Sequence, residues 1–344
     1  MVNIDASWTY TLRRTVEYLL KLDAQSLMSY VITTSWMTDA AISGYIESCD
    51  KSYMEIPIYV SQGQTIGLRM IPTERDLKFL WSEQPRLDSN AEKVRESVHN
   101  SLINWAKSCG EGSDYRDNSP SQCLSPVGHW YEFPNLLLNG TLVKMLRDRP
   151  QLQTLMLHNI DTIGVDVNAN ILGKFLESKS TLAYEVIPRR IDDMGGGLCR
   201  VNGKPRLVES LALPTDEDEL KFSYYNSLTT WIDIDKLLTQ FRLSRHDILE
   251  STEIIPQAIN EYSKRLPTYV TIKDVKKRWG RGQEDVYPVS QYEKLWGDMS
   301  AVEGIECTFL VVTRERGQQL KDPAQLDGWS RDGGAAYLES ICSW

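Results

Sequence analysis

The order of hydrophobic patterns indicates a parallel sheet in the first part of the chain. Residues 27–35 (LMSYVITTS) and 55–60 (EIPIYV) are short apolar runs typical of buried strands, and residues 9–22 have the 3.6-residue spacing of an amphipathic helix. Between the two strands we expect a second helix with Thr38 as its N-cap. The side chains expected to face inward from it are Ala41, Ile42, Tyr45 and Ile46. Strand, helix and strand at this spacing predict a βαβ unit.

The alternation of elements stops between about residues 81 and 127 and then resumes. This segment is rich in Ser, Gly, Asp and Pro, which is typical of an insertion loop. Beyond it, residues 142–147 are expected in a helix and residues 154–157 in a strand. Asn168 should cap the next helix. The buried side chains of that helix are expected to be Ile171, Leu172, Phe175 and Leu176.

Antiparallel strands are expected in the later part of the chain. Residues 182–188 (LAYEVIP) predict a strand that ends at a proline. The sequence that follows alternates like two strands joined at Asn202-Gly203, which is a strong hairpin signal. Further strands are predicted over residues 221–234 and 307–313, and a helix after the first of them. The buried residues of this helix should be Leu237, Leu238 and Phe241. The whole pattern predicts a mixed α/β sheet.

Composition and charge place the chain among ordinary globular proteins. The net charge is −9, which disfavours a nucleic-acid partner because phosphate-binding surfaces are usually basic. One basic cluster, residues 273–282 (KDVKKRWGRG), is expected to be a solvated helix end and turn. No apolar run is long enough for a membrane span, and the first residues lack the pattern of a signal peptide. The expected location is the cytoplasm. The six cysteines have no metal-site spacing and are expected to be reduced thiols.

Candidate chemistry gathers at strand ends and at glycine-rich turns. Asp161 follows the predicted strand over residues 154–157, and ligands of open α/β sheets bind beyond the carboxyl ends of strands. Asp161, with Asn159 beside it, could hold Mg²⁺, which prefers oxygen ligands. Gly128 could let a planar ligand approach the backbone, and His129 could donate to a phosphate. The turn DDMGGG could donate backbone N–H groups to a hydroxylated ligand. Local turn or cap roles remain open for each of them.

Six segments in order resemble the UDP-glucose pyrophosphorylase (UTP–glucose-1-phosphate uridylyltransferase) family, over residues 8–313. YVITTSWMTDAAISGYIE resembles the family's strand ending in Asn-Ser, and YVSQGQ its Gln-containing strand end. SPVGHWYEFPNLLLNGTLVKML resembles its Pro-Pro-Gly-His-Gly-Asp segment, and HNIDTIGVDV its Asn-Ser-Asp-Asn-Leu-Gly segment. YEVIPRRIDDMGGGLCRVNGKPRLVE resembles its Glu-Val-Thr-Pro-Lys stretch, Gly-Gly turn and Leu-Leu-Glu. FSYYNSLTTWIDI resembles its Phe-Asn-Thr-Asn-Asn-Leu-Trp strand.

The resemblance implies a fold and a domain division. It implies a Rossmann-like nucleotidyltransferase domain over residues 1–313, with a mixed central sheet and helices on both faces. Residues 314–344 are expected to form a C-terminal helical tail.

The resemblance also implies substrates and residue roles. The substrates would be UTP or a UDP-sugar and a sugar 1-phosphate, with Mg²⁺ as cofactor. The nucleotide-binding residues would be Gln62, Gln64, Gly128, Asn159 and Asp161. The catalytic residues would be His129, Asp161 and Arg314, and Asp161 would hold the metal. The residues binding sugar hydroxyls would be Gly196, Gly197, Glu209 and Asn226.

The chain also departs from the family's pattern. The family's Gly-rich nucleotide loop with its catalytic lysine has no counterpart in residues 1–13, and its C-terminal β-helix is expected to be absent. Thr313 stands where the family has the lysine of Val-Lys-Ala-Thr, with Arg314 after it, and Gly195 replaces the lysine before Gly-Gly. The Asp after Gly-His is replaced by Tyr131 or Glu132.

These departures leave three functional readings open. The first is a uridylyltransferase, expected to bind its ligands weakly and turn over slowly because preorganised donors are missing. The second is an inactive relative that binds sugar nucleotides or acts as a scaffold. The third and weaker reading is a sugar-nucleotide glycosyltransferase, for which Asp161 and Asp166 are spaced too widely to form an Asp-x-Asp pair. The oligomeric state stays open.

Overall fold

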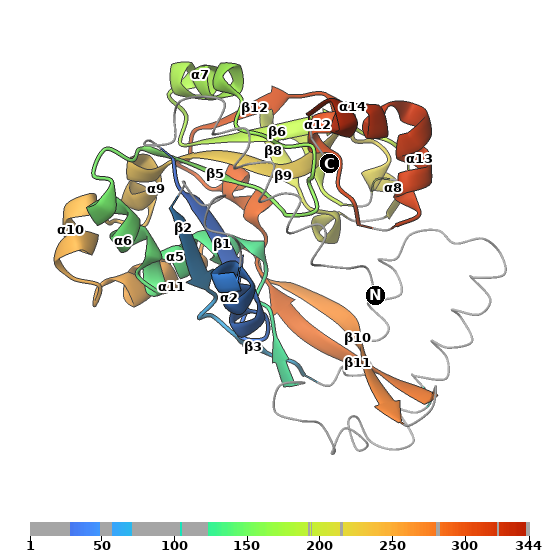
Figure 1. Cartoon of the computed structure of the whole chain (residues 1–344), viewed down its shortest axis with the longest axis horizontal. Helices are drawn as coiled ribbons and strands as arrows, with labels where there is room; N and C mark the ends of the chain where they lie inside the picture. The colour runs from blue at the N-terminus through green and yellow to red at the C-terminus, as the bar shows by residue number, and fades with distance from the viewer. Residues whose placement is uncertain are drawn as a thin grey trace.

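A mixed sheet with helices on both faces forms the body of the molecule, and a long two-stranded ribbon projects from it (Figure 1). The computed structural model describes residues 28–48, 57–70, 104, 123–191, 193, 195–213, 216–279, 283–321 and 323–341. The predicted helix over residues 9–22 and most of the predicted insertion loop lie outside these residues. No helix among the described residues is long and apolar enough to cross a membrane.

The central sheet has six strands, and the longest of them, β9, lies at its centre. β6 pairs antiparallel along one edge of β9, while β5 and β7 pair antiparallel with opposite ends of its other edge. β12 adds to β6 in parallel, and β8 adds to β7. The strands are β5 (Thr154–Leu157), β6 (Leu182–Pro188), β7 (Gly197–Val201), β8 (Lys204–Val208), β9 (Tyr224–Asp233) and β12 (Cys307–Val311). The predicted mixed α/β fold is confirmed.

The two faces of this sheet are covered by different helices. Leu182, Tyr184 and Ile232 join the main core, into which the helices on the first face pack. These helices are α5 (Glu132–Leu138), α6 (Thr141–Asp148), α9 (Ile234–Gln240), α10 (Arg245–Glu250) and α11 (Ile255–Ser263). Ala183 and Trp231 point to the opposite face, where they meet Phe175 of α7 (Ala169–Ser178). The alternation of side chains along a strand explains how neighbouring residues serve both layers.

The helix α7 begins as the sequence predicts. The side chain of Asn168 accepts hydrogen bonds from the backbone N–H groups of Asn170 and Ile171, at 3.0 and 3.3 Å. Phe175 is buried, but Leu176 is 54% exposed, so the prediction that Leu176 is buried is wrong. α7 presents only a narrow stripe to the sheet, and Leu176 lies beside that stripe.

The predicted βαβ unit is present at the start of the described chain. β1 (Tyr30–Thr34) pairs in parallel with β2 (Ile58–Gln62), and α2 (Asp39–Ser48) lies between them in sequence. No residue of α2 is fully buried: Ile42 and Ile46 are half-buried, but the expected inward orientation is wrong for Ala41 and Tyr45, which are exposed. α2 begins directly after Thr38, whose backbone oxygen accepts from Ile42 N at 3.0 Å, so Thr38 stands at the predicted N-cap position, while its side chain accepts from Ser35 N at 3.0 Å. Two strands offer too narrow a surface to bury a whole helix face.

The predicted hairpin at Asn202-Gly203 is confirmed. Both residues have positive φ, 52° and 79°, as a two-residue turn between β7 and β8 requires. The short elements that follow are η7 (Ser210–Ala212) and α8 (Asp216–Glu219).

Residues 273–279 of the basic cluster lie in a strand, so the prediction of a helix end there is wrong, while residues 280–282 lie outside the described residues. β10 (Tyr269–Trp279) pairs antiparallel with β11 (Gln283–Glu293) as the projecting ribbon (Figure 1). In this register Lys277 lies opposite Asp285 and Arg278 opposite Glu284. The strand conformation of this segment depends on its pairing with β11, which a reading of one strand alone cannot reveal. At the base of the ribbon are β3 (Gly67–Leu68), β4 (Leu124–Ser125) and η8 (Trp296–Ala301).

Three helices follow β12, namely α12 (Arg314–Gly317), α13 (Gln325–Asp332) and α14 (Gly334–Ile341). Trp329 and Leu338 from this segment form a small core with Ile163 of the loop after β5. The C-terminal segment therefore packs on the loop that contains Asp161. The division into domains at residue 313 stays a prediction.

Candidate functional site

The loop of residues 158–168 follows the carboxyl end of β5 and contains Asp161. The chain after β12 holds this loop at several points. Leu320 N donates to Asp161 O at 2.9 Å, and the hydroxyl of Tyr337 donates to Gly164 O at 3.3 Å. A Cβ added to Gly164 would lie 2.0 Å from Glu315 O, so this approach requires glycine. The position of Asp161 therefore depends on residues 314–341.

The carboxylate of Asp161 is only partly satisfied. Its Oδ1 is buried and makes no hydrogen bond within the described part of the chain. Burial raises the pKa of Asp161, while the positive charges of Lys321 and His129 act in the opposite direction. Both cations therefore lie within electrostatic reach of this carboxylate. A buried carboxylate oxygen without a partner is costly, and a bound cation or donor would offset that cost.

Lys321 lies between Asp161, which its charge affects, and Tyr225, which it contacts. Its Nζ donates to the hydroxyl of Tyr225 at 3.2 Å and lies 5.9 Å from the centre of the Tyr225 ring. The charge of Lys321 lowers the pKa of Asp161, Glu209 and Tyr225, against the larger effect of burial on each. Lys321 could not be predicted from the sequence, since nothing local distinguishes it from a surface lysine.

Three of the predicted sugar-binding residues meet beside Tyr225. Asn226 N donates to Gly196 O at 3.1 Å. A Cβ on Gly196 would lie 2.9 Å from Glu209 Oε2, so the glycine adjoins that carboxylate directly. The Oδ1 of Asn226 accepts from Leu228 N at 3.0 Å, which supports the positive φ of Leu228 in β9. Gly197 lies against Phe222, where a Cβ would come within 2.5 Å of the ring.

Glu209 is held in an unusual electrostatic setting. Burial, together with the nearby carboxylate of Asp298, raises the pKa of Glu209 to about 7. A backbone hydrogen bond from Gly297 and the charge of Lys321 act against this rise. Asp298 is itself buried, and its pKa is raised to about 6. Near neutral pH the side chain of Glu209 therefore exists both as an acceptor and as a donor.

Gly128 and His129 lie at the start of α5. His129 begins a short 3₁₀ turn (His129–Tyr131), is exposed, and affects the pKa of Asp161. Gly128 has φ 94°, and a Cβ there would lie 2.2 Å from Lys294 O. The backbone that approaches Gly128 is thus that of Lys294, so chain packing alone requires this glycine. Its predicted contact with uracil stays a prediction.

Gln62 and Gln64 are exposed at the end of β2. Two asparagines of the α5 region hold their backbones. Asn139 Nδ2 donates to Gln62 O at 2.9 Å, and Gln64 N donates to Asn135 Oδ1 at 3.1 Å. No hydrogen bond or ion pair joins either glutamine to Asp161 among the described residues. Asn159 is half-buried, and its backbone oxygen accepts from Thr162 N at 3.1 Å.

Arg314 does not face an open space in this structure. Its Nη1 and Nη2 donate to the two carboxylate oxygens of Asp193, at 2.5 and 2.6 Å, in a bidentate pair. Nη1 also donates to Pro188 O at 3.1 Å. A phosphate would have to share or replace Asp193, so the predicted catalytic role of Arg314 stays a prediction.

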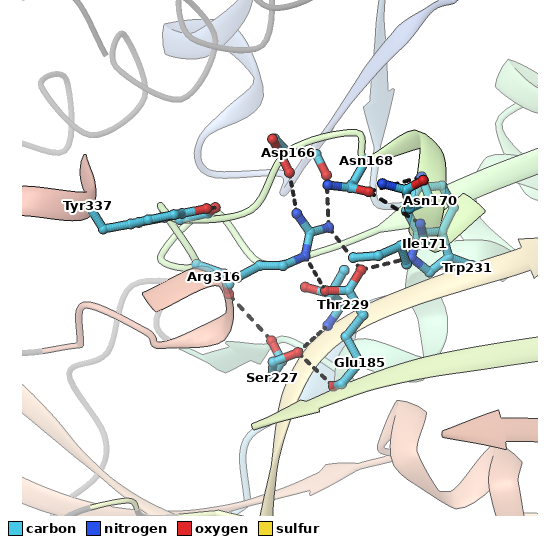
Figure 2. Close-up of polar contacts among 12 residues, drawn as sticks. Asp166, Asn168, Asn170, Ile171, Glu185, Ser227, Thr229, Trp231, Arg316 and Tyr337 are labelled. Atoms are coloured by element: carbon cyan, nitrogen blue, oxygen red, sulfur yellow. Dashed lines mark hydrogen bonds and ion pairs between the residues drawn. The ribbon is translucent and has the colours of Figure 1, made fainter. Parts of the chain in front are cut away.

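A buried ionic network anchors the far end of the Asp161 loop (Figure 2). Arg316 donates to the carboxylate of Glu185 through Nε at 2.7 Å and Nη2 at 2.9 Å. Its Nη1 pairs with the carboxylate of Asp166, and Nη2 donates to Asp166 O at 2.8 Å. Trp231 Nε1 completes the set by donating to Glu185 Oε1 at 2.8 Å. Asp166 is therefore a structural acid, which the sequence alone did not distinguish from Asp161.

The fit of a magnesium ion can be tested on Asp161. The described residues contain no cluster of three or more His, Cys, Asp or Glu side chains that could hold a metal by themselves. Magnesium is often bound through one or two carboxylates together with substrate phosphates, and does not need an all-protein cage. The unpartnered Oδ1 of Asp161 fits such a single ligand.

The strand order and the helical layers define a mixed α/β domain, and solved structures share this fold. The UDP-glucose phosphorylase of Trypanosoma brucei superposes with a TM-score of 0.59 at 16% identity, covering 92% of this chain and 56% of that one. The UDP-glucose pyrophosphorylase of Leishmania major, a G45Y mutant in complex with UDP-glucose, gives a TM-score of 0.55 at 17% identity. It covers 98% of this chain and 59% of that one.

The sequence itself matches the family described as UTP–glucose-1-phosphate uridylyltransferase over residues 111–267. The chain is 29% identical to the enzyme of that name from Solanum tuberosum over 147 residues, which are 41% of this chain and 30% of that protein. Over this segment the chain resembles that family, and the shared fold agrees with the resemblance. It spans less than a third of the length of this relative in the match.

Proposed function

We propose that this chain catalyses transfer of a uridylyl group to a sugar 1-phosphate. The supporting observation is the group of Asp161, Gly196, Glu209 and Asn226, joined through Lys321 and Tyr225 beyond the carboxyl end of β5. The family match over residues 111–267 supports the reaction class, and this position is where α/β sheets bind ligands. Neither the comparisons nor the described residues favour an inactive relative.

The reaction balances without a redox partner or a proton-transfer cofactor. An oxygen of the sugar 1-phosphate forms a bond to the α-phosphorus of UTP. The bond from that phosphorus to the bridging oxygen breaks, and pyrophosphate leaves with the electron pair. Little covalent chemistry falls to the protein, so positioning and charge stabilisation account for catalysis.

The geometry of the site is compatible with the roles that the resemblance implies. Glu209 and Asn226, beside the closely packed Gly196, would hold sugar hydroxyls, and His129 would contact the sugar phosphate. Asp161 would hold Mg²⁺, which supplies charge neutralisation to phosphate oxygens when bound. UDP-glucose is the ligand bound by the Leishmania major structure, and we propose UTP and glucose 1-phosphate as the first substrates to test.

The test is a pyrophosphate-release assay with Mg²⁺, UTP and a panel of sugar 1-phosphates, run beside calorimetric titration with UDP-glucose. We expect turnover with at least one sugar 1-phosphate. Asp161→Asn should lower kcat/KM by ~10²–10³, the usual cost of losing one preorganised electrostatic contact. Asp327→Asn, at an exposed position on α13, is the matched control and should leave the rate unchanged.

Two results would count against this proposal. Absence of both turnover and UDP-glucose binding in the folded chain would exclude it. Binding of UDP-glucose without turnover for any sugar would instead favour the inactive alternative. The expected slow rate, drawn from the departures in the sequence, is tested by the same assay.

A further inference from the structure

The segment between α12 and α13 brings one lysine to the candidate site. Leu320 N is bonded to Asp161 O at 2.9 Å, which fixes the neighbouring Lys321 beside the Asp161 loop. Lys321 N in turn donates to Gln325 Oε1 at 2.7 Å, so its backbone is held on both sides. The residue is exposed, and its Nζ donates a hydrogen bond to the hydroxyl of Tyr225 in the site.

Three arginines near the site are already paired with carboxylates. Arg314 is held by Asp193, and Arg316 by Glu185 and Asp166. Arg189 lies 3.4 Å from Glu219 and stacks near Phe222 and Tyr225. Lys321 differs, because among the described residues no carboxylate oxygen lies within ion-pair distance of it, although Asp161 and Glu209 feel its charge.

From this placement we propose that Lys321 is the phosphate-binding cation of the site, contacting the phosphates of a uridine nucleotide. The inference rests on the proposed uridylyl transfer and adds a residue that neither the family's pattern nor the sequence analysis supplies. An ammonium group has three N–H donors, and Tyr225 takes one of them. The remaining donors are available to phosphate oxygens lying between Lys321 and Asp161.

The role follows from the charge that the reaction develops. Negative charge grows on the leaving pyrophosphate, and a compact ammonium group stabilises phosphate oxygens as a point charge. Lys321 takes and gives no proton in this step. The sequence places Thr313 where the family has a lysine, and Lys321 supplies a positive charge to the same region from eight residues further on.

The test compares Lys321→Met, Lys321→Arg and the control Lys264→Met, at an exposed lysine directly after α11 that is paired with Glu261. Calorimetry measures the binding of UTP, UMP and uridine to each protein, and the pyrophosphate-release assay measures kcat/KM. We expect Lys321→Met to weaken UTP binding by ~10-fold or more and to lower kcat/KM by ~10²–10³, with uridine binding unchanged. Lys321→Arg should recover part of both losses, and Lys264→Met should match the wild type.

The outcomes separate this inference from the proposed function. If the wild type binds UTP and Lys321→Met binds it equally well, Lys321 is not the phosphate-binding cation and the proposed function stands. Equal weakening of UTP and uridine binding would show a structural role and would also overturn the inference. If the folded wild type binds no uridine nucleotide, both the proposed function and this inference are excluded. A thermal midpoint within ~2 °C of the wild type confirms that Lys321→Met is folded.

Discussion

Two charged groups lie at the two ends of one loop, and they differ in how completely they are satisfied. At the Asp166 end, Arg316 makes hydrogen bonds to Glu185 and Asp166, and Trp231 adds a donor (Figure 2). At the Asp161 end, a buried carboxylate oxygen has no partner in the described chain, and Lys321 donates a hydrogen bond to the hydroxyl of Tyr225. The charged groups at the Asp166 end are paired with one another, while the Asp161 end leaves hydrogen-bonding capacity for a ligand.

This difference separates a structural acid from a functional one within a few residues of sequence. A buried network in which every polar group is hydrogen-bonded holds a loop in place but has no free donor or acceptor for a substrate. An unsaturated group lowers the stability of the protein unless something binds there. Measurements of stability should therefore distinguish the two ends of the loop before any substrate is known.

The largest effect is expected at Arg316. Arg316→Met leaves the fully buried Glu185 without its guanidinium, and breaking a buried ion pair by removing one partner costs about 3–5 kcal/mol. Urea unfolding should show this loss in the free energy of unfolding. Arg331→Met, at an exposed position of α13, is the control and should change stability by less than ~0.5 kcal/mol. A loss below ~1 kcal/mol at Arg316 would mean that the network does not anchor the loop.

A smaller effect is expected where the loop touches α12. Gly164→Ala places a Cβ 2.0 Å from Glu315 O, and such overpacking typically costs about 1–3 kcal/mol. Gly173→Ala in α7 meets no atom within 4 Å and should stabilise the helix by up to ~1 kcal/mol. Thermal unfolding of both variants gives the comparison. Opposite signs support close packing at Gly164, and equal signs would contradict it.

The pH dependence of stability should reveal Glu209. Its pKa rises from 4.5 to about 7 on folding, so between these values the folded state binds more protons than the unfolded state. Stability therefore falls as pH rises through this window, and the full penalty is present above pH 7. Glu209→Gln should flatten this slope and raise stability at pH 8 by about 1–2 kcal/mol, allowing for the partial exposure of the group. The same slope in Glu209→Gln and in the exposed control Glu303→Gln would refute the assignment.

The smallest change is expected at Asp161, and it is the most direct comparison. Asp161→Asn removes a charge whose folded pKa is raised by burial, so stability should stay within ~0.5 kcal/mol of the wild type or rise slightly. Asp166→Asn weakens the network of Arg316 and should cost about 1–3 kcal/mol. Chemical denaturation of the two variants at pH 8 measures both. A larger loss for Asp161→Asn than for Asp166→Asn would reverse the division of roles.

Local signals in the sequence predicted much of the fold. The strands over residues 154–157 and 182–188, the cap at Asn168 and the turn at Asn202-Gly203 are all set by nearest neighbours along the chain, and all are present. The wrong predictions concern features that depend on packing and pairing between distant parts of the chain. The exposure of Leu176 and the strand conformation of the basic cluster depend on partners distant in sequence.

The candidate site was predictable only in part, for the same reason. The position of Asp161 after β5 follows from the strand–helix order, and the resemblance selected Gly196, Glu209 and Asn226, which do lie together. Periodicity could not separate Asp161 from Asp166, because the distinction depends on Arg316. Lys321 was missed since its importance comes from Tyr225 and Asp161, and neither is near it in sequence.

The pairing of Asp166 with Arg316 also constrains when the site can form. The two residues are 150 positions apart, so synthesis at ordinary rates separates them by roughly 8–30 s. During that interval Glu185 and Asp166 are present without their arginine, and the Asp161 loop lacks the backbone bond from Leu320. On the ribosome, the sheet can assemble while its acids are still uncompensated. The ligand site then takes shape after the scaffold that surrounds it.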